Sequence, residues 1–192
     1  AGTDLTIRAG AGTGSGAGGN ILLQTANAGS SGSSVNSHAT AVKIDDAGQV
    51  GIGTTPTAQL HISGDDTSNQ VIIENTSDSA DGAPDLLLKR NSASPADDDE
   101  VGQIVWQGKN DNNQFPSLAQ VRVTYKDVPD TTEDAAMQFR VMSGGSNAEI
   151  MRLENGHVGI SDNGNVPQRE FHVHNSGNTN TYLHLTNGAT GS

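Results

Sequence analysis

The stretch Gln49–Gly64 reads QVGIGTTPTAQLHISG, and the stretch His157–Asn175 reads HVGISDNGNVPQREFHVHN. Each contains a Val-Gly-Ile triplet, then a polar segment with a proline, and then an apolar-His-apolar triplet. Upstream, VKIDDAG and MRLENG place an alternating apolar and polar run before a turn that ends in glycine. Such alternation around a glycine turn is typical of a β-hairpin. The sequence therefore predicts one element twice: a hairpin, a loop and another short strand.

The two copies keep their strands and differ in their loops. Three pairs of segments match at offsets of 108, 111 and 112 residues: Val50–Ile52 with Val158–Ile160, Leu60–Ile62 with Phe171–Val173, and Val71–Asn75 with Leu183–Asn187. A repeat whose spacing drifts only in loops preserves strand geometry. We expect the repeated phrase to carry shape rather than chemistry.

Glycine stands in the middle of both triplets, at Gly51 and Gly159. Glycine inside a strand costs stability unless the backbone bends or another group approaches closely. We expect both glycines to lie where the backbone meets a neighbouring chain, as three chains packed about a common axis would provide, or where it bends sharply. In the apolar-His-apolar triplets, the histidines His61 and His172 are expected to face water. The apolar residues on either side of them are expected to face a shared core: Leu60, Ile62, Phe171 and Val173.

The apolar content is low for a chain of 192 residues. Leu, Ile, Val and Phe make up 37 of them, about 19%, and the formal net charge is −12, a combination typical of disordered chains. Short alternating runs such as VRV at 121–123 contradict disorder, because they are the pattern of strands. A core shared among identical chains satisfies both observations. The sequence therefore predicts an all-β obligate homo-oligomer, and crowded glycines favour three chains.

Other classes of protein are disfavoured by simple counts. There is no cysteine, so neither a disulfide nor a thiolate metal site can form. No apolar run approaches the ~18 residues of a membrane span, and no signal sequence opens the chain. With 10 basic against 22 acidic residues, nucleic acid is not an expected partner. The chain begins within a pattern and stops at NGATGS, so we expect a fragment of a longer protein.

Four segments follow from the pattern: a Gly/Ser-rich shaft segment at 1–48, the first repeat at 49–75, a more globular strand-rich module at 76–148, and the second repeat at 149–192. Strands are predicted in the first segment at 4–8, 20–25 and 41–45, and in the module at 85–90, 102–108, 118–125 and 136–142.

The phrases VGIGTTPTAQLHI and GAGTGSGAGGNILLQTANAGSSG, together with the segment LLLKRNSASPADDDEVGQIVWQGKNDNNQ, resemble tail-fibre and tailspike shaft proteins of tailed bacteriophages. The resemblance covers nearly all of the chain. It implies an elongated, interwoven, parallel homotrimeric β-fibre that ends in a receptor-binding or chaperone domain. The second copy departs from the phrase at Ser161, where the first has Gly53, and by extra residues before Pro167, so its turn is expected to differ.

Several motifs suggest chemistry, and each has a plainer interpretation. Gly14, Gly16 and Gly19 satisfy the G-x-G-x-x-G spacing of a dinucleotide site, but NILLQTANAGSSG is too short and broken to be the required helix. We expect a Gly-rich strand connector and no cofactor. The acidic run Asp97–Glu100, with Asp65-Asp66 and NDNN at 110–113, lacks the spacing of a calcium loop, so a solvated turn is expected.

His172 and His174 form an H-x-H pair that would give six imidazoles in a trimer, and some similar phage fibre tips bind iron in that way. The first copy has His61 and Ser63 at these positions, which favours a solvated strand face over a metal site. Trp106 and Phe115 are candidates for stacking on sugar rings, but Trp106 has the parity of Ile104, so core packing is expected. Nothing singles out a catalytic pair among the 22 acids, and no nucleophile motif occurs.

We therefore expect a non-enzymatic shaft segment of a homotrimeric phage tail fibre, which presents a receptor-binding tip for host attachment. Its expected partners are two identical chains, other fibre or virion proteins, and a glycan or protein of the host surface. Its expected location is the virion. The alternatives are a polysaccharide-degrading tailspike, and a self-assembling filament or adhesin on a bacterial cell surface.

Overall fold

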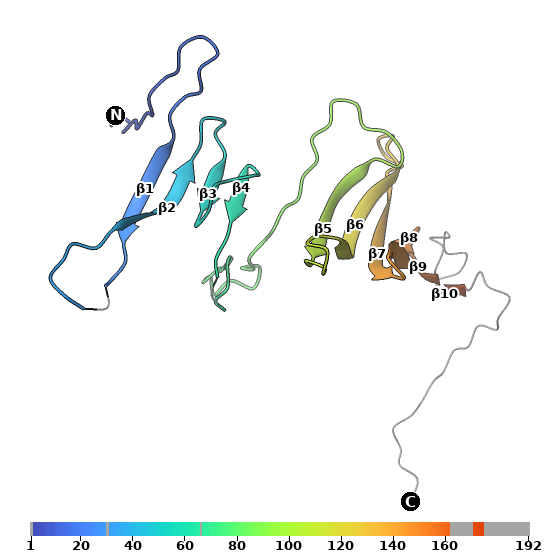
Figure 1. Ribbon diagram of the computed structural model, residues 1–192. Coiled ribbons are helices and arrows are strands. Elements are labelled where there is room, and N and C mark those ends of the chain that lie inside the picture. Colours follow the sequence, from blue (N-terminus) through green and yellow to red (C-terminus); the bar gives the residue numbers. More distant parts are fainter. Residues whose placement is uncertain (1, 30, 66, 162–170, 175–192) are drawn as a thin grey trace, which may run out of the picture. The chain divides into compact units, whose positions relative to one another are not determined.

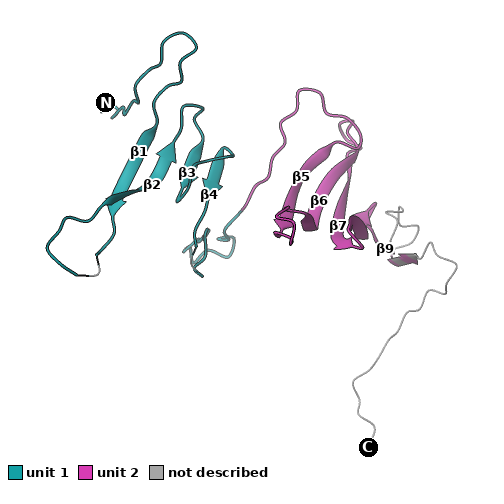
Figure 2. Cartoon of the chain, in the orientation of Figure 1, with its two compact units in different colours: residues 1–85 teal, residues 86–192 magenta. Residues whose placement is uncertain are grey.

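A computed structural model describes residues 2–29, 31–65, 67–161 and 171–174. These residues form ten strands joined by turns and loops, with no helix among them, so the predicted all-β class is confirmed (Figure 1). The chain divides into two compact units, residues 1–85 and residues 86–192, and each unit holds one sheet (Figure 2).

The first unit contains a four-stranded sheet in the order β1-β2-β3-β4. Its strands are β1 (Ile21–Ala26), β2 (His38–Ile44), β3 (Val50–Ile52) and β4 (Leu60–Ile62). The strands β1, β2 and β3 pair antiparallel, whereas β3 and β4 pair parallel. The predictions at 20–25 and 41–45 are confirmed as β1 and β2. The strand predicted at 4–8 is wrong, because this alternating run has no partner strand and exposes Leu5 and Ile7.

The second unit contains a six-stranded sheet in the order β10-β9-β8-β7-β6-β5. Its strands are β5 (Glu100–Gln107), β6 (Ser117–Asp127), β7 (Asp134–Ser143), β8 (Ser146–Glu154), β9 (His157–Ser161) and β10 (Phe171–His174). Neighbours pair antiparallel except β9 and β10, which pair parallel. The strand-rich module and the second copy of the repeat therefore share one sheet.

Two predicted strands are absent from the described residues. Within the part of the chain that the structure describes, neither the run 85–90 nor the run 71–75 has a ladder partner. The former is held beside β5 only by side chains: Arg90 Nη1 donates to the Glu100 carbonyl at 2.8 Å, and Arg90 pairs with Asp99 at 2.9 Å. The matching run 183–187 lies outside the described residues.

The hairpins form where the sequence places turn residues. Asn155 and Gly156 between β8 and β9 both have positive φ, of 54° and 73°, as a two-residue type I′ turn requires. In the first copy the turn is longer, and the Asp45 carboxylate accepts the N–H groups of Ala47 at 3.1 Å and Gln49 at 2.8 Å. Gly48 closes this turn in the left-handed region at φ 79°. Both predicted hairpins are confirmed.

The two copies also share their register. Gly51 lies between Lys43 of β2 and His61 of β4, and Gly159 lies between Arg152 of β8 and His172 of β10. In both copies the third strand runs parallel to the second. In the first copy the intervening loop crosses over the face of the sheet that holds Gly51. Similar sequence has produced the same pairing twice.

Candidate functional site

Apolar side chains cover one face of the first sheet. Residues opposite each other in neighbouring strands project from the same face. Two such rows cross the sheet: Leu23, Val42, Ile52 and Ile62, and beside them Ile21, Ile44, Val50 and Leu60. Leu60 is nevertheless 59% exposed, and Leu23 and Ile52 are exposed too. In the described part of the chain, this apolar face therefore remains partly open.

The opposite face of the first sheet is covered by the chain itself. A Cβ added to Gly51 would lie 2.2 Å from the Thr54 carbonyl oxygen and 2.9 Å from Pro56 Cδ. Within the chain, the close approach at Gly51 therefore comes from the loop between β3 and β4. His61 lies on this face, opposite Leu60 and Ile62 as expected, and is half-buried, with Nδ1 3.3 Å from Thr57 Oγ1. Gly159 is also buried.

The second sheet has a larger apolar face built in the same way. One row is Ile104, Val121, Phe139, Met151, Ile160 and Val173; the next is Gly102, Val123, Met137, Leu153, Val158 and Phe171. Phe171 is 53% exposed and Trp106, on the same face, is 52% exposed. The predicted face of Trp106 is right, but its expected core packing does not occur within a single chain.

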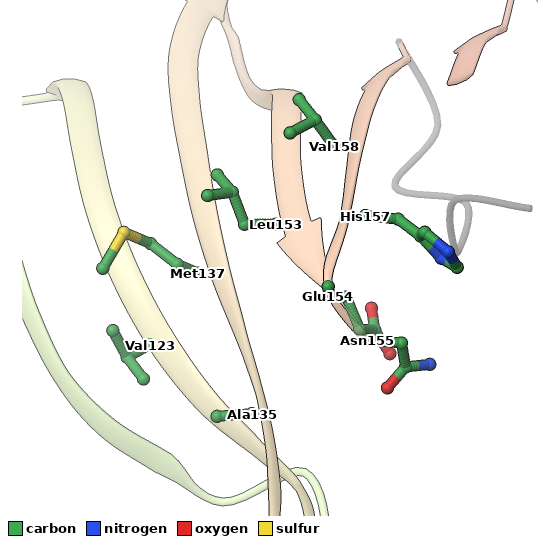
Figure 3. Close-up of a pocket in the computed structure, with 9 residues that line it drawn as sticks. Val123, Ala135, Met137, Leu153, Glu154, Asn155, His157 and Val158 are labelled. Carbon is green, nitrogen blue, oxygen red and sulfur yellow. The ribbon is translucent and has the colours of Figure 1, made fainter. Parts of the chain in front are cut away.

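Two adjoining hollows lie on this face. One holds about 390 Å³ and includes Leu153 and Val158, and the other holds about 340 Å³ and includes Leu88 and Ile104. Val123 and Met137 line both, so the hollows continue into each other. Figure 3 shows Val123, Met137 and Leu153 on neighbouring strands, beside the turn that carries Glu154 and Asn155. The alternation of apolar and polar residues in four strands could have predicted this surface, but few of its residues were named from the sequence.

The other face of the second sheet is polar and buried. Arg152 holds Glu149 through two hydrogen bonds of 2.7 and 3.0 Å and Glu154 through one of 2.7 Å, and all three side chains are buried. The hydrogen bonds with Glu149, more than those with Glu154, raise the pKa of the Arg152 guanidinium against the opposing effect of burial. Arg122 donates twice to Gln138, at 2.8 and 2.6 Å. These bonds satisfy the polar groups that the face buries.

The distribution of burial is therefore the reverse of that in an ordinary globular domain. Among the described residues, the one buried hydrophobic residue is Ala136, whereas four charged or amide side chains of the second sheet are buried. Apolar surface is what association covers most favourably. The two apolar faces are therefore the candidate functional site, and the chemistry they support is association.

The glycine motif does not have dinucleotide-site geometry. Gly14 adopts φ 60°, and the Gly16 N–H donates to the Thr13 carbonyl at 3.0 Å, which closes a turn. The segment then enters the strand β1, where a dinucleotide site requires a helix. Because no strand precedes this run, the expected strand connector is a loop that leads into β1.

The acidic run forms an exposed turn, as expected, and its members also have protein partners. Asp98 pairs with Lys126, and this hydrogen bond lowers the pKa of the Asp98 carboxyl. Asp97 accepts the Val128 N–H at 3.2 Å, and Asp99 accepts the Ala96 N–H at 2.9 Å. The run therefore fastens the start of β5 to the end of β6. In the part of the chain that the structure describes, no three His, Asp or Glu side chains gather to hold a metal; Asp66 lies outside that part.

His172 and His174 belong to β10, opposite Gly159 and Ser161, and their side chains lie outside the described part of the structure. Phe115 is exposed in the loop between β5 and β6. The side chain of Asn110 organises that loop by accepting the N–H groups of Asn112 at 3.0 Å and Gln114 at 2.8 Å.

Comparison with known proteins adds no family. No protein-family model matches the chain, and no curated protein matches it in sequence. The described residues also contain no helix that would be long and apolar enough to cross a membrane.

Proposed function

We propose that this chain is a structural, non-catalytic segment of a fibre in which identical chains bury their apolar faces against one another. The observation that carries the proposal is the reversed burial of the second sheet. Its charged face is closed by its own hydrogen bonds, and its apolar face is open. A sheet satisfied on its polar side and bare on its apolar side is suited to association through the apolar side.

The energetics favour association strongly. Fully burying one large apolar side chain contributes about 1.5–3 kcal/mol. Phe171, Trp106 and Leu60 are all more than half exposed, and several further residues on the same faces are exposed as well. Covering only a few of these per chain gives an interface energy comparable to the stability of a small domain.

Three chains are the proposed number, because the sequence resembles the trimeric shafts of phage tail fibres. In that setting the chain would hold a receptor-binding tip away from the virion. Its partners would be two identical chains and the adjoining fibre proteins, with a glycan or protein of the host surface met by the tip. The shared register of the two copies supports a shape-bearing repeat.

A polysaccharide-degrading function has less support. Glycoside hydrolysis requires one carboxyl group that stays protonated and a second that acts as base or nucleophile. The two buried carboxylates of the second sheet, Glu149 and Glu154, both bind the guanidinium of Arg152. That arrangement satisfies buried charge and does not favour proton donation.

A face-selective substitution tests the proposal. Val123→Glu places a carboxylate in both hollows of the apolar face, whereas Val35→Glu makes the same change at a loop residue that is 93% exposed. Sedimentation velocity is expected to show a trimer for the parent and for Val35→Glu, and smaller species for Val123→Glu. Equal masses for the two variants would contradict the proposal.

A further inference from the structure

Leu86, Leu87 and Leu88 form an extended run that has strand composition without strand pairing. Among the described residues, no backbone hydrogen bond joins these three to any other residue. Leu87 is 80% exposed and its two neighbours are exposed as well. Three consecutive leucines are typical of a strand that is buried on both faces. Among the described residues, this run is buried on neither of its faces.

The strand β5 offers a complementary backbone. It is the outermost strand of the second sheet, so its outer N–H and C=O groups have no strand partner among the described residues. Its sequence EVGQIVWQ contains one charge, at Glu100, and no proline. Edge strands that must not pair usually carry lysine, proline or inward-pointing charges. Between its two end irregularities, β5 has none of these.

The chain's own leucine run does not fill this edge. Leu88 lies over the apolar face: a Cβ built on Gly102 would be 3.6 Å from Leu88 Cβ, and Leu88 lines a hollow with Ile104 and Val121. Arg90 ties the end of the run to the Glu100 carbonyl through its side chain. The run therefore touches the sheet by side chains and leaves the ladder position beside β5 without a strand.

We propose that Leu86–Leu88 pairs as a strand with the outer edge of β5 in a neighbouring copy of the chain, so that the second sheet continues from one chain into the next. The inference rests on the proposed self-association and adds to it the segment that links the chains. It satisfies the unpaired backbone groups of the run and of β5 together. It also covers Leu87, which the apolar faces alone do not explain.

Single cysteines provide a clean test, because the chain contains none of its own. A Leu87→Cys chain and an Ile104→Cys chain are refolded together, treated with a short bis-maleimide, and the cross-linked peptides are identified by mass spectrometry. Each chain carries one thiol, so any link between positions 87 and 104 joins two chains. We expect this link in the assembled species.

Hydrogen exchange on the unmodified chain gives the second measurement. The amides of Leu86–Leu88 are expected to exchange at least ~100-fold more slowly in the assembly than an unpaired coil would. Leu87→Pro removes one of these N–H groups and should abolish the protection, whereas Val35→Pro should leave it unchanged.

The outcomes separate the two proposals. An assembled trimer with no 87–104 link and with freely exchanging leucine amides would overturn the strand pairing and leave the proposed function standing. Protected amides without a link between chains would also overturn it, because the run would then pair within its own chain. A chain that stays monomeric would overturn the proposed function, and this inference with it.

Discussion

Arg152 lies directly across the β8–β9 ladder from Gly159, and the guanidinium of this arginine binds two buried carboxylates. In the first copy Lys43 lies across from Gly51 in the same way. In each copy the residue across from the long basic side chain is a glycine, so no second side chain competes for the space beside it. The repeat therefore preserves this neighbour pair as well as its strands.

Removing the cation should destabilise the second unit severely. Arg152→Met leaves Glu154 buried without a partner charge and leaves Glu149 with its longer pair to Arg140, at 3.9 Å; breaking a buried pair from one side costs about 3–5 kcal/mol. Chemical unfolding measures the loss. Arg122→Met is the matched control: Arg122 donates to the neutral Gln138, and its ion pair with the exposed Glu100 is long, at 3.9 Å, so this change should cost less. Equal losses would contradict the role assigned to the carboxylates.

Gly51→Val should be poorly tolerated although valine is the better strand former. The new Cβ would fall 2.2 Å from the Thr54 carbonyl, so the crossover loop would have to move, at about 1–3 kcal/mol or more. Gly159→Val, at the same register position, is expected to lose stability too. Gly10→Val serves as control, because a Cβ there meets nothing within 4 Å. The midpoint of thermal unfolding measures the effect. An unchanged or raised midpoint for Gly51→Val would show that the position is not crowded.

Replacing the exposed apolar residues should lower the free energy of unfolding of the assembled protein more than that of the separate chain. Leu60→Ala and Phe171→Ala are expected to cost ~2–5 kcal/mol per chain in the assembled protein, because association buries both side chains. His61→Ala should cost only about 0.5 kcal/mol, since its contact with Thr57 is a single weak hydrogen bond. Unfolding at low and high protein concentration measures the difference. A concentration-independent loss for Leu60→Ala would contradict burial between chains.

Acid should weaken the junction between β5 and β6. The hydrogen bond from Lys126 lowers the pKa of Asp98 below the ordinary aspartate value of 3.8, so folding favours the ionised form. This contribution is present above pH 3.8 and is lost as the pH falls through the lowered pKa. Asp98→Asn should lower the stability slightly at neutral pH and leave it unchanged below the lowered pKa, so the acid limb of a stability-against-pH curve becomes flatter. An unaltered acid limb would show that Asp98 makes no contribution.

The sequence predicted what depends on local pattern. The hairpin turns at Gly48 and at Asn155-Gly156 follow from residues that tolerate positive φ, and alternation assigned Leu60 and Trp106 to the correct faces. Alternation states which residues share a face but not which face is covered. The buried charges around Arg152 and the half-burial of His61 were therefore not foreseen.

The features that the sequence did not predict depend on the path of loops and on which segments pair. Crowding at Gly51 was expected from the cost of glycine in a strand, but a single triplet does not indicate that the neighbour is Thr54 of the same chain. The leucine run at 86–88 was predicted to be a strand and has no partner among the described residues. The parallel pairing of β3 with β4 also depends on the path of the crossover loop, which local pattern leaves open.

The central claim is that identical chains complete each other's cores. Native mass spectrometry of the purified chain at micromolar concentration tests it most directly, because it counts the chains in a folded particle. We predict a species of three times the 19.7 kDa chain mass, with no folded monomer. A monomer that remains folded, with a cooperative thermal transition and its apolar faces bare, would contradict the account.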